Sequence, residues 1–528
     1  MLDAEPTRHD LAEAMRRRRL TLDESRTEAV AARHASGRRT ARENLDDLVD
    51  EGSFVEYGGL MIAAQRGRRD LDDLIRRTPA DGLIVGTARV NSALVGSKHA
   101  DAAVLSYDYL VLAGTQGMAG HRKNDRIFDV IERRRLPVVL FAEGGGGRPG
   151  DVDYAMAAGL DLTAFALWAG LSGLVPRIGI ASGRCFAGNA LLLGCCDLIL
   201  ATPDASIGMG GPAMIEGGGL GIVDADQVGP FDVQVRNGVI DIAAVDEADA
   251  VRLAQKALAF FQGPIDTWEA PDQVRLRDVV PDNRRRAYDV HRAIDILADA
   301  DSVLELRPRF GRGMVTALAR IEGTPIGIVA NNPMHLAGAI TSDNADKAAR
   351  FLQLCEAFQL PVVFLCDTPG IMVGPDAETT ALVRHASRLF LAGAALTVPF
   401  MTVVLRKGYG LGAHAMAGGS FRAPLMTVAW PTGEFGGMGL EGAVKLAYRK
   451  ELEAITDAAA RHAKYDSMVA EAYANGAALN TATYFEIDDV IDPAETRALL
   501  AAVVLRPASA GRAAPERDAT RRRFVDSW

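Results

Sequence analysis

Short runs of almost wholly apolar residues recur along the chain, and glycine-rich turns follow them. The run Leu136–Phe141 leads into AEGGGGRPGD (Ala142–Asp151), and a similar run that starts at Leu360 leads into CDTPG. Nearly continuous apolar runs of this length are typical of strands buried on both faces between helices. We expect helices after these turns, over 154–172 and 378–397. The pattern therefore predicts an α/β structure in which buried sheets lie between layers of helices.

The same pattern occurs twice. LPVVLFAEGGG from Leu136 matches LPVVFLCDTPG from Leu360, an offset of 224 residues. VPRIGIASGRCFAG from Val175 matches VPFMTVVLRKGYGLG from Val398, an offset of 223. A stretch rich in glycine and methionine follows in each half. Repetition that keeps its order and spacing indicates a duplicated domain.

The duplication sets the expected domain boundaries. We expect a charged helical extension over residues 1–40, a first domain over 41–280, a second domain over 281–506 and a flexible tail over 507–528. A chain of 528 residues exceeds what one hydrophobic core usually supports, which agrees with two large domains.

Composition argues against several classes of function. The net charge of −10 and the isoelectric point near 5.5 argue against a nucleic-acid surface. The sequence has no long apolar run and no apolar core near its first residues, so we expect no membrane segment and a cytoplasmic location. The 5 cysteines lack C-x-x-C spacing and the 9 histidines lack H-E-x-x-H, so we expect buried thiols and no metal in this chain.

The four consecutive glycines pose a chemical question. A phosphate-binding P-loop needs a lysine and a hydroxyl residue after its last glycine, whereas Arg148 and Pro149 follow Gly147 here. In each half, two glycine-rich turns come before helices, so their backbone amides are expected to point outward at helix N-termini. Such amides stabilise a negative oxygen, as in an oxyanion hole for a thioester. A plain strand-to-helix turn is the alternative, because glycine suits any such turn.

At this point the sequence resembles a known family, the carboxyltransferase (β) subunits of biotin-dependent acyl-CoA carboxylases, of the propionyl-CoA and acetyl-CoA type or the long-chain type. The segment RCFAGNALLLGCCDLILA (Arg184–Ala201) is similar to the oxyanion helix and following strand of the crotonase fold. The wider resemblance, in family order, rests on TARENLDDLVDEGSFVEYG, LPVVLFAEGGGGR, GRCFAGNALLL, RRRAYDVHRAID, ALARIEGTPIGIVANNP, CDTPGIMVGPDAE, RKGYGLGAHAM, VAWPT and IDDVIDPAETRALL.

The resemblance implies a fold, a reaction and partners. The fold would be two tandem crotonase-like domains of ββα units. The reaction would move CO₂ from carboxybiotin, carried by a biotin carboxylase/biotin carrier (alpha) subunit, to the α carbon of an acyl-CoA. Biotin's nitrogen would remove the α proton, and oxyanion holes would stabilise both anions. The first domain would hold the acyl-CoA and the second the biotin. A homo-hexamer with active sites between subunits is also implied.

Matching the family's motifs to this chain gives candidate site residues. The first oxyanion pair falls on Ala187 and Gly188, and the second falls on Leu411 and Gly412, with Gly410 as a competing position. The remaining walls of the two sites would be shaped by glycine-rich turns, namely Gly145, Gly146, Gly147, Pro369 and Gly370.

Side chains near these loops suggest contacts with the substrate. His121, Arg122 and Lys123 form a basic cluster after a glycine, which suits the phosphates of CoA; a polar helix start is the alternative. His414 replaces an acidic residue in the family motif YGGAYDVM, which reads YGLGAHAM here. We expect His414 to line the acyl pocket and to favour longer chains without joining the chemistry.

Two other functions remain open from the sequence. An acyl-CoA decarboxylase or hydratase on the same fold is one; a hydratase would need paired glutamates, for which Glu143 and Glu216 are the candidates. A non-catalytic CoA-binding assembly subunit is the other. The complete second domain and the glycine loops in both halves favour carboxyl transfer.

Overall fold

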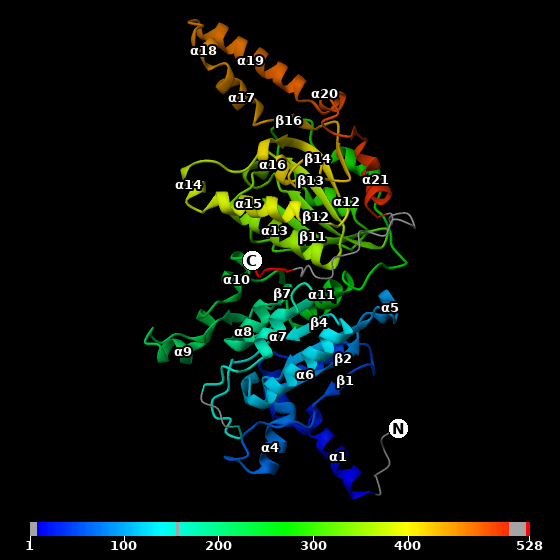
Figure 1. Ribbon diagram of the computed structural model, residues 1–528, viewed down its shortest axis with the longest axis vertical. Coiled ribbons are helices and arrows are strands. Elements are labelled where there is room, and N and C mark those ends of the chain that lie inside the picture. The colour runs from blue at the N-terminus through cyan, green and yellow to red at the C-terminus, as the bar shows by residue number, and fades with distance from the viewer. Residues whose placement is uncertain (1–7, 155–157, 506–523) are drawn as a thin grey trace. The chain divides into compact units, whose positions relative to one another are not determined.

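The computed structural model describes residues 8–154, 158–505 and 524–528 (Figure 1). The chain divides into two compact units after Gly263. Residues 264–280, which the sequence assigned to the first domain, belong to the second unit. The reason is packing: Leu276, Val279 and Val280 are buried in the hydrophobic core of the second unit.

The first unit is built on a seven-stranded sheet in the order β1-β2-β3-β4-β5-β7-β9. Strands β1 to β3 pair antiparallel, and the pairs from β3 onward are parallel. A separate parallel pair joins β6 to β8. The strands are β1 (Val55–Tyr57), β2 (Leu83–Arg89), β3 (Asp101–Tyr107), β4 (Val138–Phe141), β5 (Arg177–Ala181), β6 (Arg184–Phe186), β7 (Leu198–Ala201), β8 (Ser206–Gly208) and β9 (Ile242–Ala243).

The second unit repeats this sheet in the order β10-β11-β12-β13-β14-β15-β17, and β16 pairs with the end of β14. Its first three strands are again antiparallel and the rest parallel. The duplication seen in the sequence is therefore a duplication of topology. The strands are β10 (Leu304–Leu306), β11 (Met314–Ile321), β12 (Thr324–Asn331), β13 (Val362–Thr368), β14 (Phe400–Tyr409), β15 (Met426–Ala429), β16 (Glu434–Gly436) and β17 (Asp489–Val490).

Helices cover the sheets. Those of the first unit are α1 (His9–Arg19), α2 (Thr27–Ala35), α3 (Ala41–Leu48), α4 (Leu71–Arg77), α5 (Ser92–Val95), α6 (Met118–Arg134), α7 (Ala164–Gly170), α8 (Gly188–Gly194), α9 (Pro212–Gly217), α10 (Phe231–Arg236) and α11 (Glu247–Ala259). Those of the second are α12 (His291–Leu297), α13 (Ser342–Phe358), α14 (Pro375–Glu378), α15 (Leu382–Ala394), α16 (Gly410–Ala415), α17 (Leu440–Ala447), α18 (Arg449–Glu453), α19 (Ala458–Asn475), α20 (Ala478–Thr483) and α21 (Thr496–Leu500).

Two of the expected helices are shorter than the sequence pattern indicated. Helix α7 begins at Ala164, and Gly159 before it has φ 66°, which is not helical; residues 155–157 of the expected helix lie outside the described part of the chain. Helix α15 begins at Leu382, because Ala381 has φ 58° and interrupts the turn that follows α14. Among the described residues, no helix has the length and apolar character needed to cross a membrane.

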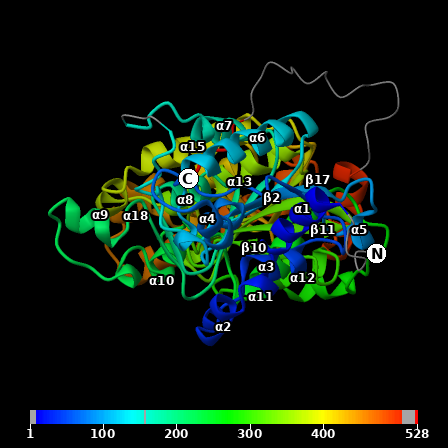
Figure 2. The same ribbon diagram turned by 90° about the horizontal axis from the view of Figure 1, so that it is seen from below.

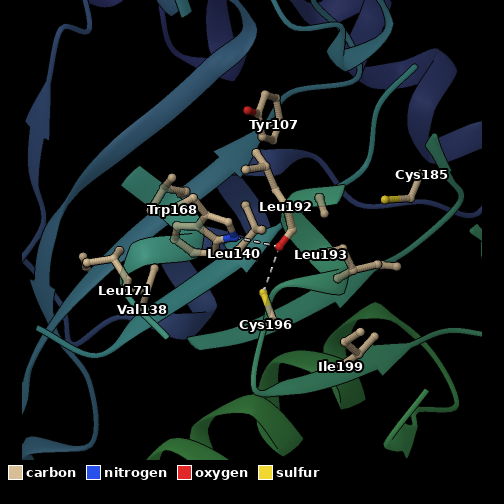
Figure 3. Close-up of a cluster of buried hydrophobic side chains, with 14 of the residues drawn as sticks. Tyr107, Val138, Leu140, Trp168, Leu171, Cys185, Leu192, Leu193, Cys196 and Ile199 are labelled. Carbon is tan, nitrogen blue, oxygen red and sulfur yellow. Dashed lines mark hydrogen bonds between the residues drawn. The ribbon is translucent and has the colours of Figure 1, made fainter. Parts of the chain in front are cut away.

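The core of the first unit explains the nearly continuous apolar runs. Alternate strand residues such as Leu83 and Leu140 pack against α6, α7 and α8 on one face, and α6 and α7 lie side by side (Figures 1 and 2). Trp168 of α7 is fully buried, and its Nε1–H donates to the Leu192 carbonyl at 2.8 Å (Figure 3). Helices α3 and α11 contact the strands as well. Cys185, Cys196, Cys355 and Cys366 are buried free thiols, as expected, whereas Cys195 is only half-buried.

The two ends of the chain are less separate from the units than the sequence suggested. The expected extension is helical, but Arg33 of α2 is buried within the first unit. Most of the expected tail of residues 507–528 lies outside the described residues, because these end at 505 and resume at 524. Residues 524–526 and 528 belong to the second unit: the Asp526 carboxylate pairs with Arg388 at 2.5 Å, and its backbone N–H donates to Gln353 at 3.0 Å.

Candidate active site

The first candidate site lies where β4 and β6 end. The Gly144 N–H donates to the Arg184 carbonyl at 2.7 Å, and the Phe186 N–H donates to the Gly144 carbonyl at 3.0 Å. These bonds fix the glycine loop beside the start of α8. Ala187 precedes α8 with φ 50°, and its N–H donates to the Gly208 carbonyl at 3.1 Å. The Ala187 amide is therefore engaged within the protein.

The amide of Gly188 lies at a helix N-terminus. Gly188 is the first residue of α8, and the N–H groups of a helix's first turn have no acceptor within the helix. The glycine loop supplies a second amide. The Gly145 N–H donates to the Ala113 carbonyl at 3.2 Å and the Gly146 N–H to Asn189 Oδ1 at 3.1 Å, whereas the Gly147 N–H has no acceptor in the described part of the chain. The free Gly147 N–H and the first-turn amide of Gly188 are thus two donors of neighbouring loops.

Close packing requires the small residues here. Gly146 has φ 86°, and a Cβ added to it would lie 2.6 Å from Ala187 Cβ. Gly147 forms a parallel bridge with Gln116, and a Cβ added to Gly188 would lie 2.5 Å from Gln116 Oε1. The backbone amides of Gly147 and Gly188 therefore both lie beside Gln116. The glycine loop and the start of α8 meet at this residue.

Arginines of the N-terminal extension hold the acidic residue that precedes the glycine loop. Both carboxylate oxygens of Glu143 accept from Arg33, at 3.0 and 2.6 Å, and Arg38 Nη1 donates to Oε1 at 2.8 Å. Burial raises the pKa of Glu143, while the two arginines oppose that shift. Glu216 is exposed on α9. The ion-paired Glu143 carboxylate is thus occupied, which disfavours its use as the acid or base of a hydratase.

The expected basic cluster is divided by the fold. Helix α6 turns the Lys123 side chain inward, where Nζ donates to the Leu83 and Ala80 carbonyls, and burial lowers its pKa to about 8. His121 is also buried, packs edge-on against Phe165, and has its pKa lowered by burial. Arg122 is exposed beside the Tyr154 ring, 4.2 Å from its centroid. The expectation of a three-residue phosphate cluster is wrong for Lys123 and His121, because the helix directs them to the core.

The second candidate site repeats this geometry. The pairing of Gly144 with Cys185 in the first unit matches the pairing of Thr368 with Gly408 in the second. Counting on from these pairs, Gly410 takes the place of Ala187, and Leu411 takes the place of Gly188. Ala187 and Gly410 share a positive φ, of 50° and 55°.

The free amides of the second site follow from that register. Among the described residues, the Ile371 N–H has no acceptor. Leu411 and Gly412 lie in the first turn of α16, where backbone N–H groups have no acceptor within the helix. Ile371 bridges Ile340 as Gly147 bridges Gln116. Gly370 has φ 127°, and a Cβ on Gly412 would lie 2.7 Å from its backbone. The Leu411 side chain is exposed to solvent, so it does not pack over the backbone N–H of Leu411. Sequence reasoning missed Ile371, although it lies 224 residues after Gly147.

A cavity of about 800 Å³ opens beside the second site, within the second unit. Gly410 and His414 line it, together with an aromatic wall of Phe421, Phe435, Tyr484 and Phe485. The His414 ring stacks on Phe421 with centroids 6.1 Å apart. His414 therefore lies in a cavity wall, and its expected contact with the acyl chain stays a prediction.

Pro369 and Gly370 form the turn after β13, and Asp367 before them is fully buried. Its carboxylate accepts from Arg406 at 3.1 Å and from the Lys407 N–H at 3.2 Å. Asp367 therefore matches Glu143 in position and in being held by basic residues. Both carboxylates anchor the loops that follow them.

The chain matches the family model described as carboxyl transferase domain over residues 32–520. It is 33% identical to the methylmalonyl-CoA carboxyltransferase 12S subunit of Propionibacterium freudenreichii subsp. shermanii, over 90% of each chain. It is 31% identical to the biotin-dependent long chain acyl-coenzyme A carboxylase beta4 subunit of Mycobacterium tuberculosis, over 94% of this chain and 93% of that one.

Solved structures agree. A single-chain, multi-domain long-chain acyl-CoA carboxylase is 62% identical with a TM-score of 0.90, covering 94% of this chain. This chain spans 49% of that protein, about half its length. The hexameric transcarboxylase 12S, solved with methylmalonyl-CoA and methylmalonic acid bound, is 30% identical with a TM-score of 0.82, over 96% of this chain and 98% of that one. With the repeated sheet order, these likenesses confirm the expected α/β fold of two tandem crotonase-like domains.

Proposed function

The chain belongs to the carboxyl transferase domain family, and on that premise we propose that it moves a carboxyl group between carboxybiotin on a partner subunit and the α carbon of an acyl-CoA. One observation carries the proposal. Each unit presents a loop amide without an acceptor, that of Gly147 or Ile371, together with a first-turn helix amide at the equivalent position, that of Gly188 or Leu411. A reaction that develops negative charge on two different oxygens needs two such sites.

The residues present fit both substrates. Carboxybiotin, when bound, supplies CO₂ and a nitrogen that accepts the α proton. The Gly147 and Gly188 amides would stabilise the thioester oxygen as it becomes negative. The Ile371, Leu411 and Gly412 amides would stabilise the ureido oxygen. Removal of one donor of this kind costs about 10²–10³ in turnover where measured.

The assignment of substrates to units follows the family. The first unit would hold the acyl-CoA thioester and the second the biotin. The partner would be a biotin carboxylase/biotin carrier subunit. A homo-hexamer is proposed from the hexamer of the transcarboxylase 12S. A longer acyl chain is favoured by the 62% identity to a long-chain carboxylase and by His414 in the cavity wall.

Reconstitution tests this function. The purified chain would be combined with a biotinylated carboxylase/carrier protein, ATP, labelled bicarbonate and a series of acyl-CoAs. We expect labelled carboxyacyl-CoA only when all components are present. Gly188→Pro should lower turnover by about 10² or more, because it removes one donor. Robust carboxylation by the chain without the carrier, or normal turnover by an assembled Gly188→Pro protein, contradicts the proposal.

A further inference from the structure

Gln116 is a buried polar residue that lies directly against Gly188. Its side chain is 6% exposed, and Oε1 would be 2.5 Å from a Cβ on Gly188. Its backbone is fixed on both sides: its N–H donates to the Gly146 carbonyl at 2.7 Å, and its carbonyl accepts from the Arg148 N–H at 2.8 Å. The Gln116 backbone is therefore hydrogen-bonded on both sides to the glycine loop, which carries the free N–H of Gly147.

The Arg148 side chain makes this loop rigid. Its guanidinium donates to the Thr115 carbonyl at 2.9 Å and to Thr115 Oγ1 at 3.2 Å. It also pairs with the fully buried Asp81 carboxylate at 2.5 Å. The Gln116 side chain starts from this rigid loop, so it can donate a hydrogen bond with little reorganisation, which is what an oxyanion donor requires.

The Tyr107 hydroxyl needs one acceptor, which a half-turn of either the Gln116 or the Asn124 amide can supply. Tyr107 Oη lies 3.2 Å from Gln116 Nε2 and 3.2 Å from Asn124 Nδ2. If both nitrogens donate, the phenol hydrogen finds no acceptor among the described residues. A half-turn of the Gln116 amide keeps the shape of the side chain. Tyr107 then donates to Oε1, and Nε2 faces Gly188.

The alternative is a half-turn of Asn124, which leaves Oε1 beside Gly188. An acceptor at that place would repel a negative thioester oxygen, whereas an N–H would stabilise it. Burial raises the pKa of Tyr107, so its hydroxyl keeps the proton that it must donate at neutral pH. Chemistry at this site thus favours the orientation in which Gln116 is a donor.

The second unit has no such side chain at the matching position. The loop LAGTQ, which ends at Gln116, corresponds to LAGAI, which ends at Ile340. Ile340 bridges Ile371 as Gln116 bridges Gly147, and its side chain is fully buried. The polar group therefore distinguishes the first site from the second, as expected if the two sites stabilise different anions.

We propose that Gln116 is a catalytic residue of the first site, whose Nε2–H donates to the thioester oxygen beside the Gly188 N–H as negative charge develops. Tyr107 acts through Gln116 as a positioning residue. This inference rests on the proposed function, because it assigns a third donor to the same oxyanion site. Loss of the Gln116 hydrogen bond should lower kcat rather than raise KM, because this donor stabilises the transition state more than the ground state.

The test uses the full-length chain with free biocytin as acceptor and, as carboxyl donors, carboxyacyl-CoAs of increasing chain length that begin with malonyl-CoA. The donor that wild type uses best is then kept for all variants. We expect Gln116→Leu to lower kcat by about 10² with KM changed by less than about threefold. Gln116→Glu should lose at least as much, because it offers only acceptors. Tyr107→Phe should lose about tenfold, since the amide is no longer oriented. Gln227→Leu and Gln227→Glu, at an exposed glutamine of the same unit, serve as matched controls and should match wild type.

Several outcomes overturn the inference. Wild-type kcat in Gln116→Glu would make Gln116 an acceptor, and a raised KM with unchanged kcat would make it a ground-state contact. If the Leu and Glu proteins fail to fold, Gln116→Asn decides: it withdraws the amide by one methylene, and an unchanged kcat refutes the donor role. An active wild type with normal variants refutes this inference alone. A wild type that cannot carboxylate biocytin refutes the proposed function as well.

Discussion

The ion pair between Arg33 and Glu143 ties the N-terminal helices to the first site, and its removal has a calculable cost. Both side chains are buried, at 8% and 7% exposure, and two hydrogen bonds of 3.0 and 2.6 Å join them. Replacing Arg33 by Met leaves a buried carboxylate without its main partner, which typically costs about 3–5 kcal/mol. Arg38 still holds one oxygen of Glu143, so we expect about 3 kcal/mol, the lower end of that range.

Denaturant unfolding at one fixed protein concentration measures this cost. The matched control is Arg38→Met, which removes a more exposed partner of the same carboxylate and should cost about 1 kcal/mol or less. Arg33→Met combined with Glu143→Gln should recover part of the loss, because the buried Glu143 charge that lost its partner is then removed. A cost below about 0.5 kcal/mol for Arg33→Met, or no recovery in the double variant, would refute the reasoning.

The pH dependence of Arg33→Met adds a second check. Burial already raises the pKa of Glu143, and loss of Arg33 must raise it further. An acid whose folded pKa exceeds its unfolded pKa destabilises the protein above that folded value, and the penalty disappears as pH falls below the unfolded value. The stability gap between the variant and wild type should therefore narrow as the solution is acidified.

Three further predictions concern the second unit. Gly412→Ala should lower kcat by about 10², because the new Cβ would lie 2.7 Å from the backbone of Gly370; normal kinetics would show that the loop moves freely. His414→Asp should shift relative kcat/KM toward shorter acyl-CoAs by about tenfold, and an equal fall for all chain lengths would place His414 in the chemistry. The Glu305 carboxylate, with help from a neighbouring aspartate, raises the pKa of His291 to about 9. Its stabilisation is present below pH 6.5 and lost as pH rises through 9, so His291→Gln should lose stability at pH 6 and match wild type at pH 10 in thermal unfolding.

The duplicated fold was predictable because it rests on hydrophobic pattern, which the sequence displays directly. The apolar runs before AEGGGGRPGD and CDTPG are indeed parallel strands β4 and β13, and the glycine turns follow them. The place of Gly188 at the start of a helix was predictable for the same reason, since its loop and helix carry a recognisable motif. The domain boundary was harder, because residues 264–280 join the second core through only a few buried apolar residues.

Other parts of the site depend on contacts that no local pattern reveals. The direction of Lys123 depends on which face of α6 meets the sheet, and a basic residue gives no sign of this. Arg33 lies in a charged segment, yet it reaches a carboxylate 110 residues away. Gln116 stands out only when the two halves are aligned, because Ile340 occupies the matching position in the second half. Ile371 could not be identified from its residue type either, because its proposed role belongs to its backbone N–H.

The most direct test follows the carboxyl group itself. A carboxyacyl-CoA labelled in its transferable carboxyl would be incubated with the full-length chain and free biocytin, and both products would be counted. Carboxyl transfer predicts that label appears on biocytin in equal amount to the acyl-CoA released, and that release is slow without biocytin. Release of acyl-CoA at the same rate with and without biocytin, with all label lost as CO₂, would identify a decarboxylase and contradict the account.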